Sequence, residues 1–279
     1  MKIINYLKTS LLTLLITSLL VITGCKQRSS ATKAGESATD TTAINMQEVK
    51  SDVQEIVYPL PAPFELSQEL DRAGASYVGN VLNPVSNADK YFTEKSKALA
   101  LGVYGADLAY AGTYDNAQDV NKYSGVLKSL VDDLGINVKY TDYFNDNSRE
   151  KLNNKDTLVK VVSNVFYDTY TFLNKKSDPA LAALVVSGTW VEGLYIATHI
   201  TKDTYNNNEM VKLIYDQSKS LEKVIGLLDK FQNNEVVSGI SGALKKLKAM
   251  YDETNGSLTK EQLDTITKTI ETIRSSIVS

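Results

Sequence analysis

The chain has 279 residues, of which 43% are hydrophobic, and its 30 basic and 33 acidic side chains give a formal net charge of −3. The lysines are interspersed with aspartates and glutamates, so the basic footprint that nucleic-acid binding requires is missing. One histidine, His199, excludes multi-histidine zinc sites, and one cysteine, Cys25, excludes a disulfide within the chain. No motif for a metal or cofactor is present, and we expect neither.

The first 25 residues have the order of a bacterial export signal. Lys2 and Lys8 make the start positive, residues 11–22 are mostly apolar, and small residues precede Cys25. The apolar run is shorter than the roughly 20 residues that span a bilayer, which favours a cleaved signal over a permanent anchor. The stretch Ile22-Thr23-Gly24-Cys25 resembles a lipobox, and on these residues the chain resembles a bacterial lipoprotein precursor.

That resemblance implies cleavage after residue 24 and acylation of Cys25 with two or three fatty chains. Each buried methylene contributes about 0.8 kcal/mol, so several chains hold a protein in a bilayer essentially permanently. Lys26 stands where an aspartate would imply retention at the inner membrane. We therefore expect an outer-membrane lipoprotein that faces the periplasm, with the cell surface as the alternative.

Three regions follow from these patterns: a signal peptide (1–24), a lipidated tether (25–62) and a folded domain (63–279). The tether is rich in Ser, Thr, Ala and charged residues and is too poor in large apolar residues to fold. A coil of this length reaches roughly 30–35 Å, enough to hold a domain clear of lipid headgroups. Alternating prolines at its end favour an extended lead-in to the domain.

The region from Pro63 onward predicts an all-α domain. Apolar residues recur with the 3.6-residue period, and no segment shows a convincing two-residue alternation. We expect about eight helices in one bundle-like or stacked-hairpin domain, with short connections between antiparallel neighbours. The expected helices cover residues 63–73, 86–112, 120–134, 158–172, 179–200, 210–228, 236–251 and 260–277.

The stretch from Pro179 to Ile200 is the most apolar part of the mature chain and long enough to cross a membrane. It contains Glu192 and His199, and a carboxylate at a bilayer centre costs at least about 2.5 kcal/mol. A central helix surrounded by the other helices is therefore the better interpretation.

Two polar stripes are candidates for a functional site. Glu192, Tyr195 and His199 share one face of the apolar helix, while Tyr104 and Asp107 begin a similar stripe that continues through Tyr110 and Tyr114. One hypothesis is that the two faces meet around a polar pocket for a ligand, bordered by Tyr104, Asp107, Glu192, Tyr195 and His199. The alternative is a structural network, because buried carboxylates need hydrogen-bond partners and tyrosine hydroxyls supply them.

Glycines occur within both of these helices, at Gly102, Gly105, Gly188 and Gly193. Each costs about 1 kcal/mol relative to alanine in a helix interior, so a compensating role is expected. Close helix approach is the ordinary explanation, and room for a bound ligand is the alternative.

The combination of lipobox, polar tether and helical domain resembles uncharacterised helical lipoproteins of Bacteroidota, a resemblance that transfers no functional residues. We expect a lipid-anchored envelope protein that acts as a helical binding or scaffolding module. Its partners would be the bilayer, through acylated Cys25, and another envelope protein or a glycan. The alternatives are a lipoprotein that binds a small molecule or glycan in a pocket between helices, and an envelope hydrolase that uses Glu192 or His199.

Overall fold

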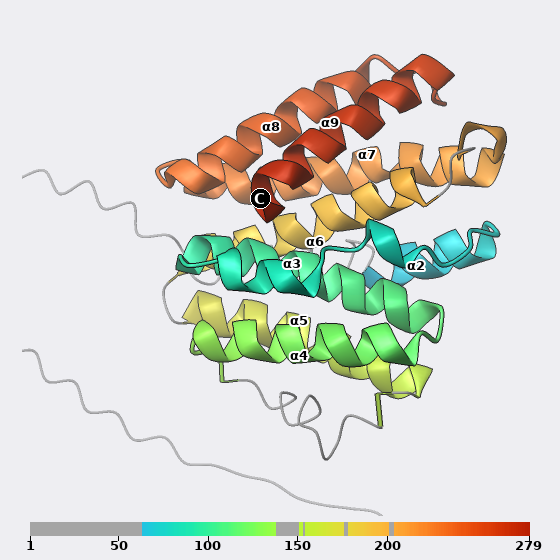
Figure 1. Cartoon of the computed structure of the whole chain (residues 1–279). Helices are drawn as coiled ribbons and strands as arrows, with labels where there is room; N and C mark the ends of the chain where they lie inside the picture. The colour runs from blue at the N-terminus through green and yellow to red at the C-terminus, as the bar shows by residue number, and fades with distance from the viewer. Residues whose placement is uncertain (1–62, 138–150, 153, 176–177, 201–203) are drawn as a thin grey trace, which may run out of the picture. The chain divides into compact units, whose positions relative to one another are not determined.

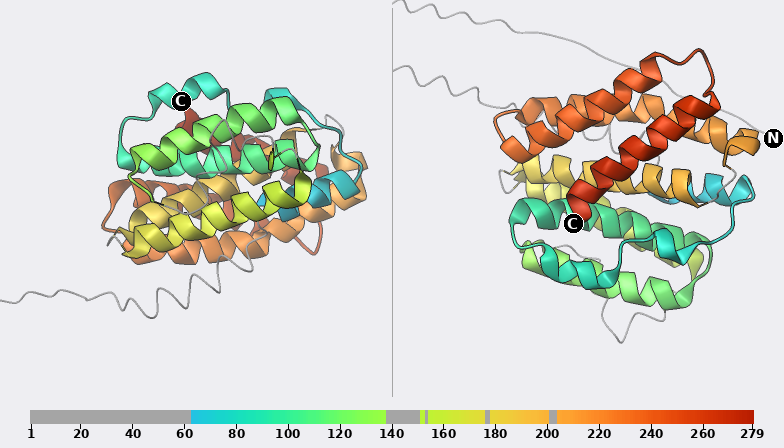
Figure 2. Two further views of the ribbon diagram at one scale, coloured as in Figure 1. Left: turned by 90° about the horizontal axis from the view of Figure 1, so that it is seen from below. Right: turned by 45° about the horizontal axis from the view of Figure 1, so that its top comes forward.

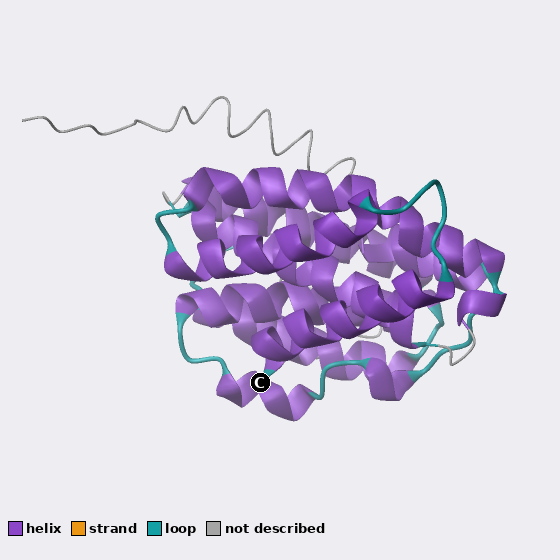
Figure 3. Cartoon of the chain, turned by 90° about the horizontal axis from the view of Figure 1, so that it is seen from above, coloured by secondary structure: helices purple, strands orange, loops and turns teal. Residues whose placement is uncertain are grey.

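The computed structural model describes residues 63–137, 151–152, 154–175, 178–200 and 204–279 (Figure 1). These residues form eight α-helices joined by loops and short 3-10 turns, with no strand among them (Figure 3). The predicted all-α class is confirmed, while the predicted signal peptide and tether lie outside the described residues. The helices are α2 (Pro63–Arg72), α3 (Glu94–Thr113), α4 (Ala117–Asp133), α5 (Lys155–Lys175), α6 (Pro179–His199), α7 (Asn208–Leu228), α8 (Glu235–Asp252) and α9 (Lys260–Val278).

Local capping residues set the starts of α6 and α9 at the predicted positions. Asp178 caps α6 by accepting from the Leu181 amide, with Pro179 at the first helical position. The capping box predicted for Thr259 and Gln262 opens α9. These side chains satisfy amides that have no partner inside the helix.

The start of α3 differs from the prediction. Residues 85–90, expected to open the long helix, form the 3-10 helix η2 (Val85–Lys90), and α3 begins eight residues after Ser86, at Glu94. Thr93 provides the better cap, because its Oγ1 accepts from the Ser96 amide while Ser96 Oγ accepts from the Thr93 amide, both at 3.0 Å. This reciprocal pair satisfies two donors at once, which Ser86 and Asp89 do not match here.

Helices α3 and α6 form the centre of the domain and run in the same direction. Their axes approach closely where Gly102 of α3 faces Gly188 of α6. A Cβ atom on Gly102 would lie 2.1 Å from the Val185 carbonyl oxygen, and one on Gly188 would lie 2.2 Å from the Leu99 carbonyl oxygen. Close approach, the ordinary explanation for these two glycines, is therefore confirmed.

The other helices cover this central pair from two sides. Helices α4 and α5 lie on one side and α7, α8 and α9 on the other (Figures 1 and 2). An ion pair of 2.6 Å joins Lys97, near the start of α3, to Asp133 at the end of α4, so these neighbours are antiparallel as predicted. The hydrogen bond from Tyr251 to the Ile214 carbonyl joins the end of α8 to the start of α7 in the same antiparallel sense.

Helix α6 is long and apolar enough to cross a membrane by length and composition, and it is the one helix of the described residues for which this holds. Of its most apolar stretch, 78% is buried inside the domain. It packs against α2, α3, α5, α7, α8 and α9. The burial of apolar surface against neighbouring helices accounts for its composition.

Candidate functional site

A pair of carboxyl groups and an arginine meet at the centre of the domain, one from each of three helices. Asp107 of α3 and Glu192 of α6 are both 0% exposed, and they lie close enough together for each to shift the pKa of the other. Arg274 of α9 donates from Nε to Glu192 Oε2 and from Nη2 to Glu192 Oε1, each at 2.8 Å. Such a bidentate pair fixes the orientation of both planar groups. We call these three residues the acid–arginine cluster.

The cluster contains two acids and one base, so its charges balance only when one acid carries a proton. Burial raises the pKa of Asp107 well above its ordinary value, and the nearby charge of Glu192 raises it further. Burial also raises the pKa of Glu192, but the hydrogen bonds and charge of Arg274 oppose that increase. We therefore assign the proton to Asp107 and the negative charge to Glu192.

Hydrogen bonding around Asp107 agrees with this assignment. Its Oδ2 accepts from the Asn83 amide at 3.2 Å, whereas its Oδ1 finds no partner among the hydrogen donors of the described residues. A protonated carboxyl supplies its own donor, which the neighbouring Glu192 carboxylate can accept.

Tyr195 and His199 are half-buried at the edge of the acid–arginine cluster. The Arg274 guanidinium carbon lies 4.0 Å from the centre of the Tyr195 ring, and the His199 ring stacks on Tyr195 with 4.0 Å between ring centres. His199 Nδ1 donates to the Tyr195 carbonyl at 2.9 Å. Burial lowers the pKa of His199, so its imidazole is neutral at pH 7. These contacts leave Arg274 enclosed between a carboxylate and an aromatic face.

The tyrosine stripe of α3 binds the connection between α2 and α3, residues 73–93, rather than a ligand. Tyr104 donates to the Pro84 carbonyl and Tyr114 to the Ala75 carbonyl, each at 2.9 Å. Tyr110 accepts from the Val78 amide at 2.9 Å, and burial raises the pKa of Tyr110 to about 12. The connection runs antiparallel to α3, so successive tyrosines along the helix bond to successively earlier residues of the connection.

Asn83 links this connection to the acid–arginine cluster. Besides its amide bond to Asp107, its carbonyl accepts from Tyr123 at 3.1 Å and its Nδ2 donates to Tyr91 at 3.0 Å. Arg274 Nη2 also donates to the Val81 carbonyl at 3.2 Å. The connection is thus held to α3, α4 and α9 by buried hydrogen bonds.

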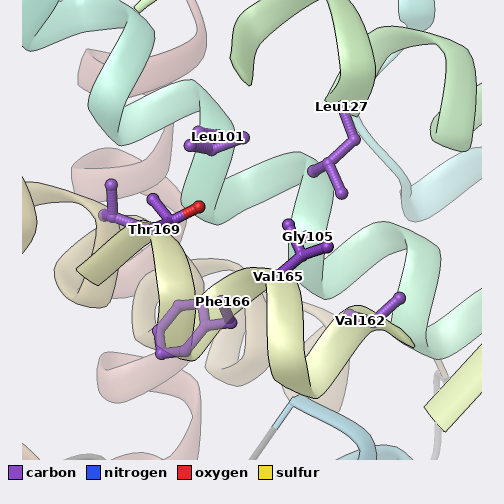
Figure 4. A pocket seen from close by; sticks show the side chains of 8 residues that line it. Leu101, Gly105, Leu127, Val162, Val165, Phe166 and Thr169 are labelled. Carbon is purple, nitrogen blue, oxygen red and sulfur yellow. The ribbon is translucent and has the colours of Figure 1, made fainter. Parts of the chain in front are cut away.

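The structure therefore brings the two predicted faces together, but as a packed network. Asp107 contacts Glu192, Tyr195 contacts Arg274, and His199 contacts Tyr195, whereas the Tyr104 hydroxyl bonds to the connection. Two small cavities lie within the described part of the chain, one of them shown in Figure 4, and none of the five predicted residues lines either of them. Lipidation of Cys25, the sixth predicted site, falls outside the described residues.

Arg274 and Asn83 were not identified from the sequence. Arg274 follows Ile270 by four residues and precedes Ile277 by three, so it shares a face with buried isoleucines. A cation on an apolar helix face, in a chain with carboxylates on another apolar helix, is a signal for a buried ion pair. Asn83 carries no comparable signal, because its neighbours show no regular pattern.

The chemistry open to the acid–arginine cluster is limited by its enclosure. Glu192 has no access to solvent and its charge is neutralised by Arg274, so no substrate reaches it without local opening. Among the described residues, no group of three His, Cys, Asp or Glu side chains could hold a metal ion. The cluster therefore serves to hold α3, α6 and α9 together by buried polar contacts.

No protein-family model, curated protein or solved structure matches this chain. The residues described above are therefore the basis for a functional proposal.

Proposed function

We propose that the protein is a lipid-anchored component of the bacterial cell envelope whose helical domain docks onto another envelope protein. The anchor would be Cys25, on the strength of the lipobox-like residues Ile22 to Cys25 and the apolar segment before them. Lipid chains on Cys25 would confine the domain to a membrane surface, where even weak docking becomes effective through a high local concentration.

The observation that carries the docking proposal is the exposure of Phe92. Its side chain is 82% exposed, and Val85, on the same connection, is 37% exposed. Aromatic side chains supply much of the binding energy at protein interfaces, so an exposed phenylalanine offers a partner an apolar anchor. The connection that presents Phe92 is held by the tyrosine hydrogen bonds described above, so little conformational freedom would be lost on binding.

A protein partner fits this surface better than a lipid surface. The charged residues nearest to Phe92 in the sequence are Asp89, Lys90, Glu94 and Lys95, and two acids and two bases give no positive excess. Attraction to anionic headgroups requires such an excess of Lys and Arg. A folded partner with an apolar pocket needs only the aromatic side chain and a polar rim.

The enclosure of the acid–arginine cluster supports binding over catalysis. A general acid or base must reach a substrate within hydrogen-bond distance, and Glu192 is fully buried in an ion pair. His199 already donates from Nδ1 to a backbone carbonyl of its own helix. Both residues therefore support the fold in this arrangement.

A photo-crosslinking amino acid at position 92 of the full lipoprotein in its native cells tests the docking proposal. The matched control places the same amino acid at Tyr205, an aromatic residue that is 41% exposed. Tyr205 lies near the other end of the connection, because Asn207, two residues away, donates to the Ala73 carbonyl. We expect a discrete protein adduct from position 92 that is absent from position 205. Adducts with lipid alone, equal adducts at both positions, or none would overturn the proposal.

A further inference from the structure

The loop that joins α8 to α9, residues 253–259, contains the one Asn-Gly pair of the sequence, Asn255-Gly256. We call these residues the α8–α9 loop, which lies at the edge of the domain (Figures 1 and 2). Asn255 and Gly256 are both exposed, whereas Leu258 is buried with 4% exposure. The α8–α9 loop therefore holds an Asn-Gly pair in reach of solvent, and such a pair can react within the chain.

The backbone amide of Gly256 is open to attack on the neighbouring side chain. Its N–H has no acceptor among the described residues. The φ angle of Gly256 is +79°, in the left-handed region, and a Cβ atom built on this residue would meet nothing within 4 Å. Because glycine has no side chain beside its nitrogen, no group of its own hinders the approach of the preceding side chain to that atom.

The side-chain amide of Asn255 is free as well, unlike those of the asparagines that cap helices. Asn116, Asn207 and Asn234 each accept from backbone amides of the helix that follows, and these bonds fix their side chains. In the part of the chain that the structure describes, no residue hydrogen-bonds to the Asn255 side chain. Asn255 is therefore able to rotate between its staggered rotamers and bring Cγ to the Gly256 nitrogen.

These two groups can form a five-membered ring. The Gly256 nitrogen gives up its proton and attacks Cγ of Asn255, so a C–N bond forms, and Nδ2 leaves with that proton as ammonia. The product is a succinimide. Water then opens the ring in one of two ways: breakage of the bond to Cγ yields aspartate, and breakage of the bond to the backbone carbonyl carbon yields isoaspartate. Water is the one co-reactant, and no oxidant or reductant is needed.

We propose that Asn255 is a self-modification site, at which the folded chain converts a side-chain amide into a carboxylate through a succinimide with Gly256. Both products add one negative charge to the α8–α9 loop, and isoaspartate also adds a methylene to the backbone between the two helices. Asn83, by contrast, precedes a proline, which has no N–H to react. The site shares no residue with the acid–arginine cluster or the surface around Phe92, so it is independent of the proposed docking.

Incubation of the purified full chain, folded in detergent at pH 8 and 37 °C, tests this proposal by peptide mass spectrometry. Trypsin releases residues 249–260, in which Asn255 is the only side-chain amide, and residues 231–245, which contain the capping Asn234 and serve as an internal control. We expect the first peptide to gain the mass of an amide-to-acid conversion within days, well ahead of the control. The product should separate into aspartate and isoaspartate forms, and an isoaspartyl methyltransferase should methylate the second.

Two variants locate the reaction. Asn255→Gln keeps a side-chain amide but requires a larger ring, so the modification should be lost. Gly256→Ala places a Cβ beside the attacking nitrogen and should also lose it, whereas the matched control Gly242→Ala, on α8 where a Cβ meets nothing within 4 Å, should react as the unaltered chain does. The proposal is overturned if the folded chain stays unmodified, if aspartate forms without isoaspartate, or if Asn255→Gln reacts equally fast.

Discussion

The two carboxyl groups of the acid–arginine cluster should respond very differently to neutralisation. Glu192→Gln removes the carboxylate that accepts two hydrogen bonds from Arg274, and the guanidinium then lacks this hydrogen-bonded counter-ion in a buried site. Loss of one partner of a buried ion pair costs about 3–5 kcal/mol. We expect the lower end, about 3 kcal/mol, because the Arg274 side chain retains 11% exposure and can gain some solvation.

Asp107→Asn should be nearly neutral by comparison. Asp107 is assigned the proton at pH 7, so the amide reproduces its charge, its shape and its ability to donate to Glu192. The amide oxygen also still accepts from the Asn83 amide. We expect a loss of no more than about 1 kcal/mol, the worth of one imperfect hydrogen bond.

Urea unfolding of both variants at pH 7, followed by circular dichroism at 222 nm, measures these differences directly. For a domain of this size, a loss of about 3 kcal/mol corresponds to a fall in melting temperature of roughly 6–12 °C. If Asp107→Asn were as destabilising as Glu192→Gln, the proton would not reside on Asp107 and the assignment would be wrong.

Three further outcomes follow from the structure. Folding raises the pKa of Asp107, so the stability that this residue contributes is complete below pH about 4 and is lost as the pH rises through the raised pKa. The urea midpoint of the unaltered chain should therefore fall as the pH rises from about 4, and the midpoint of Asp107→Asn should fall less. Tyr104→Phe removes a hydroxyl bond to the connection and should cost about 1 kcal/mol in thermal unfolding, whereas Tyr205→Phe, at an exposed site, should cost nothing measurable. Gly102→Ala inserts a methyl group against the α6 backbone and should destabilise the domain by more than about 3 kcal/mol, or prevent folding. Gly226→Ala on α7, where a Cβ meets nothing within 4 Å, should stabilise it by up to about 1 kcal/mol. Equal effects of the two variants in calorimetry would contradict the close approach of α3 and α6.

Most of the fold could be predicted because its signals are local. The helical period, the Asp178 cap and the Thr259–Gln262 capping box depend on residues within one or two turns, and the structure has all of them. The start of α3 was misplaced because two possible capping pairs lie within eight residues of each other. The predicted pair was Ser86 and Asp89, whereas the reciprocal bonds form between Thr93 and Ser96. Nothing local distinguishes them.

The site was harder to predict because its partners are far apart in the sequence. The polar stripes of α3 and α6 were recognised, but whether they line a pocket or close into a network depends on Arg274, 82 residues beyond Glu192. The close approach of α3 and α6 gave an even weaker signal, since Gly102 and Gly105 look alike in sequence and differ only in what a Cβ atom would meet. Such differences arise from tertiary packing alone.

The most direct test of lipid anchoring is mass spectrometry of the N-terminal peptide of the native protein, isolated from cell membranes. We predict a peptide that begins at Cys25 and carries a diacylglyceryl group and a further acyl chain, and a Cys25→Ser variant that no longer fractionates with membranes. A peptide that begins at Met1, or an unmodified Cys25 thiol, would contradict the proposal that this helical domain is fastened to the envelope by lipid.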